Sequence, residues 1–272
     1  MSNYPLISVV MPIYNTRIDY LQDSVNSILN QSYDNFELLC IIDPVNLEND
    51  DVVNALEEIK NDKRLKIYKN KVKKGFIGSL NYGCHLSKGE YIARMDSDDI
   101  SYPKRFEIQI NELLKRKIDF LGSWAVIIDE NNKIIGKIVT PVNYIELKSK
   151  ILLHNPFLHG SMIFKKSAIK NIGYYDVSMF GAEDYYLWMK AIYRGYIFAN
   201  INNFLIKIRR VNNSIMRGTN WRRTRFNYIK AKYNIINEYG FRNPLSFVYF
   251  ISSFFSIYIS PKNADYIKKI IF

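Results

Sequence analysis

Three carboxylates fall within four residues in the segment Asp96-Ser97-Asp98-Asp99. The apolar run before them opens at Tyr91 and predicts a buried strand, with the acids at its carboxyl end. Carboxylates packed this closely repel one another, so we expect a cation among them. Hard oxygen ligands favour Mg²⁺ or Mn²⁺ over softer metals. The alternative is a solvated acidic turn that caps the helix expected near Pro103.

The first hundred residues alternate short apolar runs with amphipathic helical patterns, which predicts a βαβαβαβ order. The expected strands cover residues 7–11, 36–42, 65–68 and 91–95. Because these strands are apolar almost throughout, they indicate an α/β fold with a parallel sheet covered by helices on both sides. Ligands of such sheets bind beyond the carboxyl ends of the strands. Tyr14, Asn15, Asp43 and the Asp96–Asp99 acids all fall at such ends, so we expect them to line one crevice.

The next hundred residues add an antiparallel part and a second acidic group. Residues 120–128 and 134–139 flank a polar turn and predict a hairpin. A further strand pair is expected at about 196–199 and 205–208. Glu183-Asp184 stands at the start of a predicted helix, where an acid pair can simply complement the helix dipole.

The end of the chain carries most of the net charge of +12. Residues Phe204 to Phe272 hold thirteen Lys or Arg and only two Asp or Glu, an excess of eleven positive charges. Such a segment could meet nucleic acid, an anionic membrane or a phosphorylated ligand. With no linker or repeat before about Asn212, we expect one domain over residues 1–211 and a basic, aromatic-rich helical extension over 212–272.

The extension has two parts. A helix is predicted from Trp221 to about Tyr239, and residues 245–259 form an apolar, aromatic run. That run is short for a membrane span, which needs about 20 residues. Clustered Arg and Lys beside Phe, Tyr and Ile instead fit helices that lie in the interface of an anionic membrane. The alternative is an ordinary helical subdomain or a dimer contact.

The cysteines and the N-terminus indicate a cytoplasmic protein. Cys40 and Cys84 lie in apolar runs without metal-ligand spacing, so we expect buried, reduced thiols. The N-terminus has no basic region followed by a small-residue cleavage site, and no secretory signal is visible.

Six motifs in order resemble those of a family 2 inverting glycosyltransferase with the GT-A fold, over approximately residues 5–211. They are Pro12-Ile13-Tyr14-Asn15, Ser27-Ile28-Leu29-Asn30-Gln31-Ser32-Tyr33, Phe36-Glu37-Leu38 leading to Asp43, Gly75 to Asn81, Asp96-Ser97-Asp98 as the DXD motif, and Glu183-Asp184 as the acidic pair. The chain departs from many relatives at Ile42, where a second acid is common, and at Pro44. It also has Asn212 where relatives often carry a His.

The resemblance implies a role for each site residue. Asp98, Asp96 and Asp99 would hold Mn²⁺ or Mg²⁺, and Asp184 would be the catalytic base with Glu183 beside it. The donor would contact Pro12, Tyr14, Asn15, Asp43, Asn81, Arg94, Asp96 and Ser97. His159, Gly160 and Arg210 would face the acceptor or the diphosphate.

The function implied by this resemblance is metal-dependent, inverting transfer of a sugar from a nucleotide-diphosphate donor, with a UDP-sugar as the leading class. The acceptor would be a hydroxyl of a glycan or lipid-linked saccharide of the cell surface, reached from the cytoplasm or from the cytoplasmic face of the membrane. Transfer to a polyprenyl phosphate by the same fold is one alternative. Nucleic-acid binding through the basic tail and a silent nucleotide-sugar binder are two others.

Overall fold

The computed structural model describes residues 4–44, 50–59, 61–210 and 221–240, together with residues 250, 251, 253 and 254. Its strands are β1 (Ile7–Ile13), β2 (Phe36–Ile42), β3 (Leu65–Lys69), β4 (Tyr91–Arg94), β5 (Ile100–Ser101), β6 (Phe120–Ile128), β7 (Ile134–Ile138), β8 (Ile163–Lys165) and β9 (Phe198–Arg209). Its helices are α1 (Ile18–Leu29), α2 (Asp50–Glu57), α3 (Gly75–Leu86), α4 (Arg105–Arg116), α5 (Tyr144–Lys150), α6 (Lys166–Ile172), α7 (Glu183–Tyr193) and α8 (Trp221–Tyr239), with a 3-10 helix η1 (His159–Ser161).

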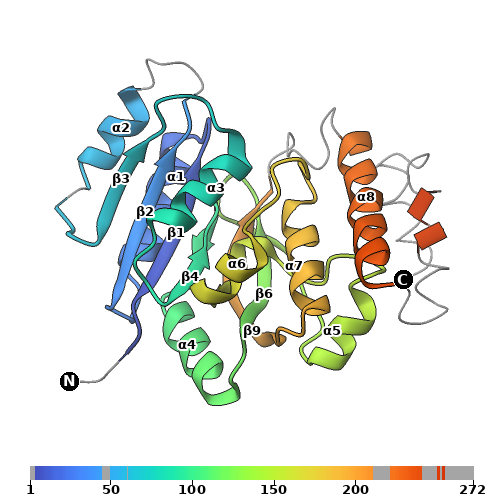
Figure 1. The fold of residues 1–272 in the computed structure, drawn as a ribbon. Coiled ribbons are helices and arrows are strands. Elements are labelled where there is room, and N and C mark those ends of the chain that lie inside the picture. Colours follow the sequence, from blue (N-terminus) through green and yellow to red (C-terminus); the bar gives the residue numbers. More distant parts are fainter. Residues whose placement is uncertain are drawn as a thin grey trace.

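One mixed sheet runs through the molecule in the order β3-β2-β1-β4-β8-β6-β9-β5, with β7 paired to β6 (Figure 1). The strands β3, β2, β1 and β4 are parallel, and Ile7 of β1 lies opposite both Phe36 of β2 and Tyr91 of β4. Their carboxyl ends therefore share one edge. This confirms the predicted α/β architecture and the place of the Asp96–Asp99 turn at that edge.

Helices cover both faces of the sheet, and the strands are apolar because each face borders a hydrophobic core. Val9 and Met11 point into the core beneath α1 and α4, whereas Val10 points into the core beneath α3, α6 and α7. Cys40 and Cys84 lie buried in opposite cores as free thiols, as predicted.

The antiparallel part begins at β8, which pairs with β4 on one side and β6 on the other. The hairpin β6–β7 is confirmed. The strand pair expected at 196–199 and 205–208 is wrong, because β9 is one continuous strand that runs parallel to β6. The exposed residues Asn202 and Asn203 lie where the register between β9 and β6 shifts, beside Trp124. They form an irregularity within β9 and not a turn between two strands.

The predicted helix of the extension is confirmed as α8, which runs alongside α7 (Figure 1). Its Ala231 and Ile235 are fully buried in the core shared with α3, α6 and α7. The apolar run 245–259 lies outside the described residues except for positions 250, 251, 253 and 254. No described helix combines the length and apolarity that crossing a bilayer requires.

Candidate active site

Arg94 is the last residue of β4 and forms the centre of the site. Its guanidinium pairs with the Asp96 carboxylate, lies 5.4 Å from the centre of the Phe76 ring and is only 3% exposed. Burial acts to lower the pKa of this group, but Asp96 and Asp99 outweigh burial and raise it. The Arg94 charge in turn lowers the pKa values of acids in both acidic groups, Asp98 and Asp184 among them. Both acidic groups therefore lie within electrostatic reach of Arg94.

Asp98 and Asp99 are held in a tight turn at the end of β4. Burial raises the pKa of Asp98 to about 6, with the neighbouring charge of Asp96 as the second cause. Burial, then Asp96 and Asp98, raise the pKa of Asp99 well above its usual value. The Asp99 Oδ1 accepts a hydrogen bond of 2.9 Å from the main-chain N–H of Arg209. Among the described residues, no side chain donates a hydrogen bond to the Asp98 carboxylate.

Arg209, which the sequence interpretation passed over, anchors this turn. Its Nε donates to the Asp98 carbonyl oxygen at 2.9 Å, and its Nη2 lies 3.3 Å from the Asp23 carboxylate. The guanidinium also sits 4.0 Å from the centre of the Tyr20 ring, and the side chain is fully buried. Arg210, the residue chosen from the sequence, is exposed. The sequence signal for Arg209 was a basic residue at the end of an apolar strand. It was missed because the predicted strand stopped at residue 208, one residue before Arg209.

The donor set fits a divalent cation of the Mg²⁺ or Mn²⁺ type. A Cβ placed on Gly160 would lie 3.2 Å from both Asp96 Oδ2 and Asp99 Oδ2, so the missing side chain leaves space where two carboxylates meet. No three acidic, His or Cys side chains among the described residues form a complete ligand cluster. Such cations commonly take one or two carboxylates and complete their coordination with water and substrate phosphates. Asp98, to which no described side chain donates, is the carboxylate best suited to this.

Asp43 ends β2 and is 2% exposed. Its Oδ1 accepts hydrogen bonds from Asn70 Nδ2 at 2.9 Å and from the Lys74 N–H at 2.8 Å, and its Oδ2 accepts from the Gly75 N–H at 2.8 Å. The carboxylate therefore fastens the loop that begins α3. Contact with a nucleotide base remains a prediction, for which Oδ2 keeps one acceptor position.

The loop after β1 presents the other donor residues. Pro12 is buried in β1, and Tyr14 is 45% exposed with its hydroxyl 3.3 Å from Lys73 Nζ. Asn15 has a φ of 50°, a left-handed conformation that turns the chain. The Thr16 hydroxyl lies 2.6 Å from the Ser97 hydroxyl, which ties this loop to the acidic turn.

Asn81 and His159 meet at Tyr175. The Asn81 side-chain amide exchanges two hydrogen bonds with the Tyr175 backbone, at 2.8 and 3.0 Å. The Tyr175 hydroxyl lies 2.9 Å from His159 Nε2. Burial, and then the charge of Arg94, lower the pKa of His159 well below its usual value, so its imidazole is neutral. Asn81 thus positions Tyr175, and contact of Asn81 with the donor stays a prediction.

Glu183 and Asp184 form the first turn of α7, and both are strongly shielded from water. Burial raises the pKa of Glu183 to about 7, with Asp184 as the second cause, and its Oε2 has no hydrogen-bond donor among the described residues. Burial raises the pKa of Asp184 to about 6. Asn155 Nδ2 donates to Asp184 Oδ2 at 2.8 Å, and the Tyr185 N–H donates to Oδ1 at 2.6 Å. These two carboxyls therefore exchange protons near neutral pH.

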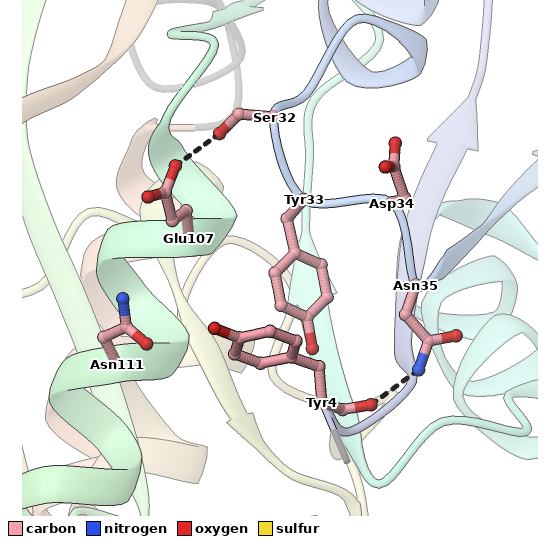
Figure 2. A pocket seen from close by; sticks show the side chains of 7 residues that line it. All are labelled: Tyr4, Ser32, Tyr33, Asp34, Asn35, Glu107 and Asn111. Carbon is pink, nitrogen blue, oxygen red and sulfur yellow. Dashed lines mark hydrogen bonds between the residues drawn. The ribbon is translucent and has the colours of Figure 1, made fainter. Parts of the chain in front are cut away.

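A crevice of about 440 Å³ lies away from these residues (Figure 2). It is lined by Tyr4, Ser32, Tyr33, Asp34, Asn35, Glu107 and Asn111. Tyr4 and Asn35 precede β1 and β2, so the crevice opens at the amino ends of these strands. Ser32 donates to Glu107 at 2.7 Å and Asn35 to the Tyr4 carbonyl at 2.7 Å, so the lining groups partly satisfy one another. Ligands of parallel sheets bind at the opposite edge, where Arg94 lies.

Comparisons with known proteins agree with this geometry. A family model described as Glycosyl transferase family 2 matches residues 8–173. The Escherichia coli protein named UDP-Glc:alpha-D-GlcNAc-diphosphoundecaprenol beta-1,3-glucosyltransferase WfgD is 29% identical over 269 residues, which cover 98% of each chain.

Two solved structures share the fold. S. aureus TarS 1–349 in complex with UDP-GlcNAc has a TM-score of 0.72 at 19% identity, covering 94% of this chain and 74% of that one. The mannosyltransferase PcManGT of Pyrobaculum calidifontis, in complex with GDP-Man and Mn²⁺, has a TM-score of 0.66 at 15% identity, covering 94% of this chain and 70% of that one. These likenesses confirm the predicted GT-A fold.

Proposed function

The chain belongs to glycosyltransferase family 2, and on that premise we propose that it transfers a sugar from a UDP-sugar to a hydroxyl of a lipid-linked saccharide, with inversion at the anomeric carbon. The observation that carries the proposal is that Arg94 pairs with Asp96 in the turn and lies over the Phe76 ring. Ring contacts lead from Phe76 through His159 to Trp188 of α7, the helix that begins with the Glu183-Asp184 pair. WfgD is named for a UDP-Glc donor and a diphosphoundecaprenol-linked acceptor, and TarS binds UDP-GlcNAc. The first supports a lipid-linked saccharide as acceptor, and both support a UDP-sugar as donor.

The donor would lie along the carboxyl ends of β1, β2 and β4. Tyr14 offers an exposed ring on which a base can stack, and the free acceptor position of Asp43 suits the N–H of uracil. Asn15 and Ser97 line the way from the base to the diphosphate, and Arg94 would pair with phosphate or ribose. A divalent cation bound by Asp98, with Asp96 and Asp99 beside it, would neutralise the charge of the departing diphosphate.

Asp184 would act as the general base. As the acceptor oxygen attacks the anomeric carbon, its proton passes to the Asp184 carboxylate, the bond from carbon to the diphosphate breaks and UDP leaves. One in-line displacement inverts the centre and needs no covalent nucleophile. With a pKa of about 6, Asp184 is ionised at pH 7 and still basic, which suits a general base. Glu183, with a pKa of about 7, is half protonated there and suits the role of its neutral neighbour.

The extension supports a place at an anionic membrane, where a lipid-linked acceptor would be found. On the outer side of α8, Arg222 and Arg223 are exposed, and Phe226 and Tyr233 are 59% and 56% exposed. Cations beside aromatic rings on one helix side suit a surface of anionic headgroups. We therefore assign residues 1–211 to transfer and residues 212–272 to an extension that meets the membrane.

Sedimentation with vesicles tests this placement. The protein should bind phosphatidylglycerol vesicles, bind phosphatidylcholine vesicles weakly, and leave both as salt rises. Phe226→Ala should weaken binding, whereas Ile145→Ala, at an equally apolar and 82% exposed position on α5, should not. Equal binding to both lipids, or equal loss in both variants, would contradict the assignment.

The experiment that tests the transferase is a panel of nucleotide sugars with and without Mn²⁺, scored by donor hydrolysis and by protection against thermal unfolding. Stabilisation by one UDP-sugar that depends on Mn²⁺ is the expected result. Stabilisation by a GDP-sugar instead would mean that the donor is a GDP-sugar. No effect from any nucleotide sugar, with or without Mn²⁺, would overturn the proposal.

A further inference from the structure

Helix α8 packs its buried side against the segment that leads into Glu183-Asp184. Asn227 Nδ2 donates to the Phe180 carbonyl oxygen at 2.8 Å. A Cβ on Gly181 would lie only 2.4 Å from Thr224 Oγ1, so the first turns of α8 touch the Gly181 backbone directly. Gly181 has a φ of 76°, which a side chain would strain. Any residue but glycine here would separate α8 from the acid pair.

Asn155 connects α8 to the acid pair. Its Nδ2 donates to Asp184 Oδ2 at 2.8 Å, and its Oδ1 accepts from the Phe157 N–H at 3.1 Å. Because the main chain takes the amide oxygen, the amide nitrogen must face Asp184. The Asn155 side chain also acts on the phenol of Tyr228 on α8, whose pKa it lowers. Tyr228 stacks on Tyr185 with ring centres 4.5 Å apart and an angle of 16°.

We propose that Asn155 and Tyr228 are positioning residues for Asp184, so that α8 completes the base side of the active site. The proposal rests on the proposed function, in which Asp184 is the base. It gives the extension a second role besides contact with a membrane: the outer side of α8 meets the surroundings while its inner side holds the carboxylate in place. The segment matched by the family model ends at residue 173, so Asn155 lies within it and Tyr228 beyond it.

The hydrogen bond from Asn155 would fix the direction of the Asp184 carboxylate, and the stack of Tyr228 on Tyr185 would hold the start of α7 beside it. A neutral amide that donates to a carboxylate favours the ionised form and opposes the effect of burial. Burial raises the pKa of Tyr228 far above its usual value, so its phenol stays neutral and adds no charge. The other groups that act on this site are Glu183 on the same helix, Arg94 from β4 and Tyr175 from the loop before α7.

Three variants test the proposal through kcat against pH, the donor KM and the thermal unfolding midpoint. Asn155→Ala should lower kcat at pH 7 by about 10- to 100-fold and move the acidic limb of the profile to higher pH, because Asp184 loses a donor. Asn155→Asp keeps the shape but places a second carboxyl beside Asp184, so its limb should move further still. Tyr228→Phe keeps the ring stack and should lower kcat by about 2- to 10-fold. The donor KM should stay unchanged in all three.

The order of the two Asn155 variants separates positioning from packing. If Asn155 only fills space, the isosteric Asp is milder than Ala, and that order would overturn the proposal. An unmoved limb in Asn155→Ala and Tyr228→Phe together would also overturn it. The controls are Asn111→Ala and Tyr4→Phe, both at exposed positions near the amino ends of the strands, which should leave the profile unchanged.

Failure of the proposed function gives a different result. If Asp184→Asn still transfers sugar, Asp184 is not the base and the premise falls. If Asp184→Asn abolishes transfer while Asn155→Ala and Tyr228→Phe leave kcat and the acidic limb intact, only the positioning role is wrong. Should Asn155→Asp unfold, Tyr228→Phe still decides, because it removes one hydroxyl and keeps the stack.

Discussion

The Asp96–Asp99 turn and the Glu183-Asp184 pair both gather carboxylates at one edge of the sheet, but their surroundings differ. The turn is surrounded by cations, since Arg94 pairs with Asp96 and Arg209 binds the turn from the other side. The donors to the pair among the described residues are neutral, Asn155 Nδ2 and backbone N–H groups such as that of Tyr185, and Glu183 Oε2 has none. The carboxylates of the turn and those of the pair therefore lie in different electrostatic surroundings.

The causes of the raised pKa values show what each setting does. The pKa of Asp98 is raised by burial and also by the like charge of Asp96. A bound cation would offset this repulsion between the two carboxylates. Among the main causes that act on the pKa of Asp184, only burial raises it. A cation at the turn would not change that burial. With a cation bound, the turn would keep its charge during the reaction, whereas the pair would still exchange a proton. This difference supports the proposed assignment of cation binding to the turn and of base chemistry to the pair.

Asp184→Asn should give the largest effect of any single change. The amide cannot take a proton, so kcat should fall by about 10²- to 10⁴-fold, while UDP-sugar binding should stay because the proposed donor site lies at the turn. Steady-state kinetics and donor titration by thermal shift measure the two properties separately. Loss of UDP-sugar binding in this variant would mean that Asp184 also serves the donor, which would contradict the separate roles proposed for the turn and the pair.

Asp98→Asn should show the converse pattern. Its kcat/KM should fall by about 10²- to 10³-fold, and protection by a UDP-sugar should no longer depend on Mn²⁺, because the amide is a weak ligand for a hard cation. Asp34→Asn, at a side chain that is 94% exposed near the amino end of β2, is the matched control. Unchanged Mn²⁺ dependence in Asp98→Asn would place the cation elsewhere.

The sequence predicted the turn well because its residues are close together in the chain. Asp96 to Asp99 follow a buried strand, and parallel pairing then places Tyr14 and Asp43 at the same edge. The supports of the pair could not be predicted in the same way. Asn155 stands 29 residues before Asp184, in a segment without strand or helix periodicity. Tyr228 was one aromatic residue among many in a helix that the sequence correctly placed.

Among the other elements, too, those with a local sequence pattern were predicted, and those that depend on distant contacts were not. Apolar periodicity predicted β2, β6 and α8 to the residue, since burial on one or both faces fixes their pattern. β9 was split in two, because exposed Asn202 and Asn203 mimic a turn in the sequence. Arg209 and Arg210 are adjacent cations, and only the pleat of β9 decides that Arg209 points inward.

Arg209→Met against Arg210→Met tests the support of the turn. Removing the buried guanidinium leaves the carbonyl oxygens of Asp98 and Asp129 without this donor and ends the ion pair with Asp23, so Arg209→Met should lower the free energy of unfolding by about 3 kcal/mol. Arg210 is exposed, and Arg210→Met should change it by no more than about 0.5 kcal/mol. Urea unfolding of the two variants gives both values. Equal losses would mean that Arg209 does not anchor the turn.

Glu183→Gln tests the pair through stability, with a smaller effect. The Glu183 pKa is raised from 4.5 to about 7 in the folded protein, so the folded state holds its proton more firmly than the unfolded state. Stability from this group is complete below pH 4.5 and is lost as pH rises towards 7. The neutral Gln removes that loss, so at pH 8 the variant should be more stable than the wild type by about 1–3 kcal/mol, and at pH 4.5 equal to it.

Urea unfolding at pH 4.5, 6 and 8 measures this difference, with Glu130→Gln at an exposed position as the control. Because Asp184 titrates beside Glu183, the drop belongs to the pair as a unit. A constant difference across the three pH values would mean that folding does not shift the Glu183 pKa. Base chemistry would then have to be sought in the surroundings of Asp184 alone.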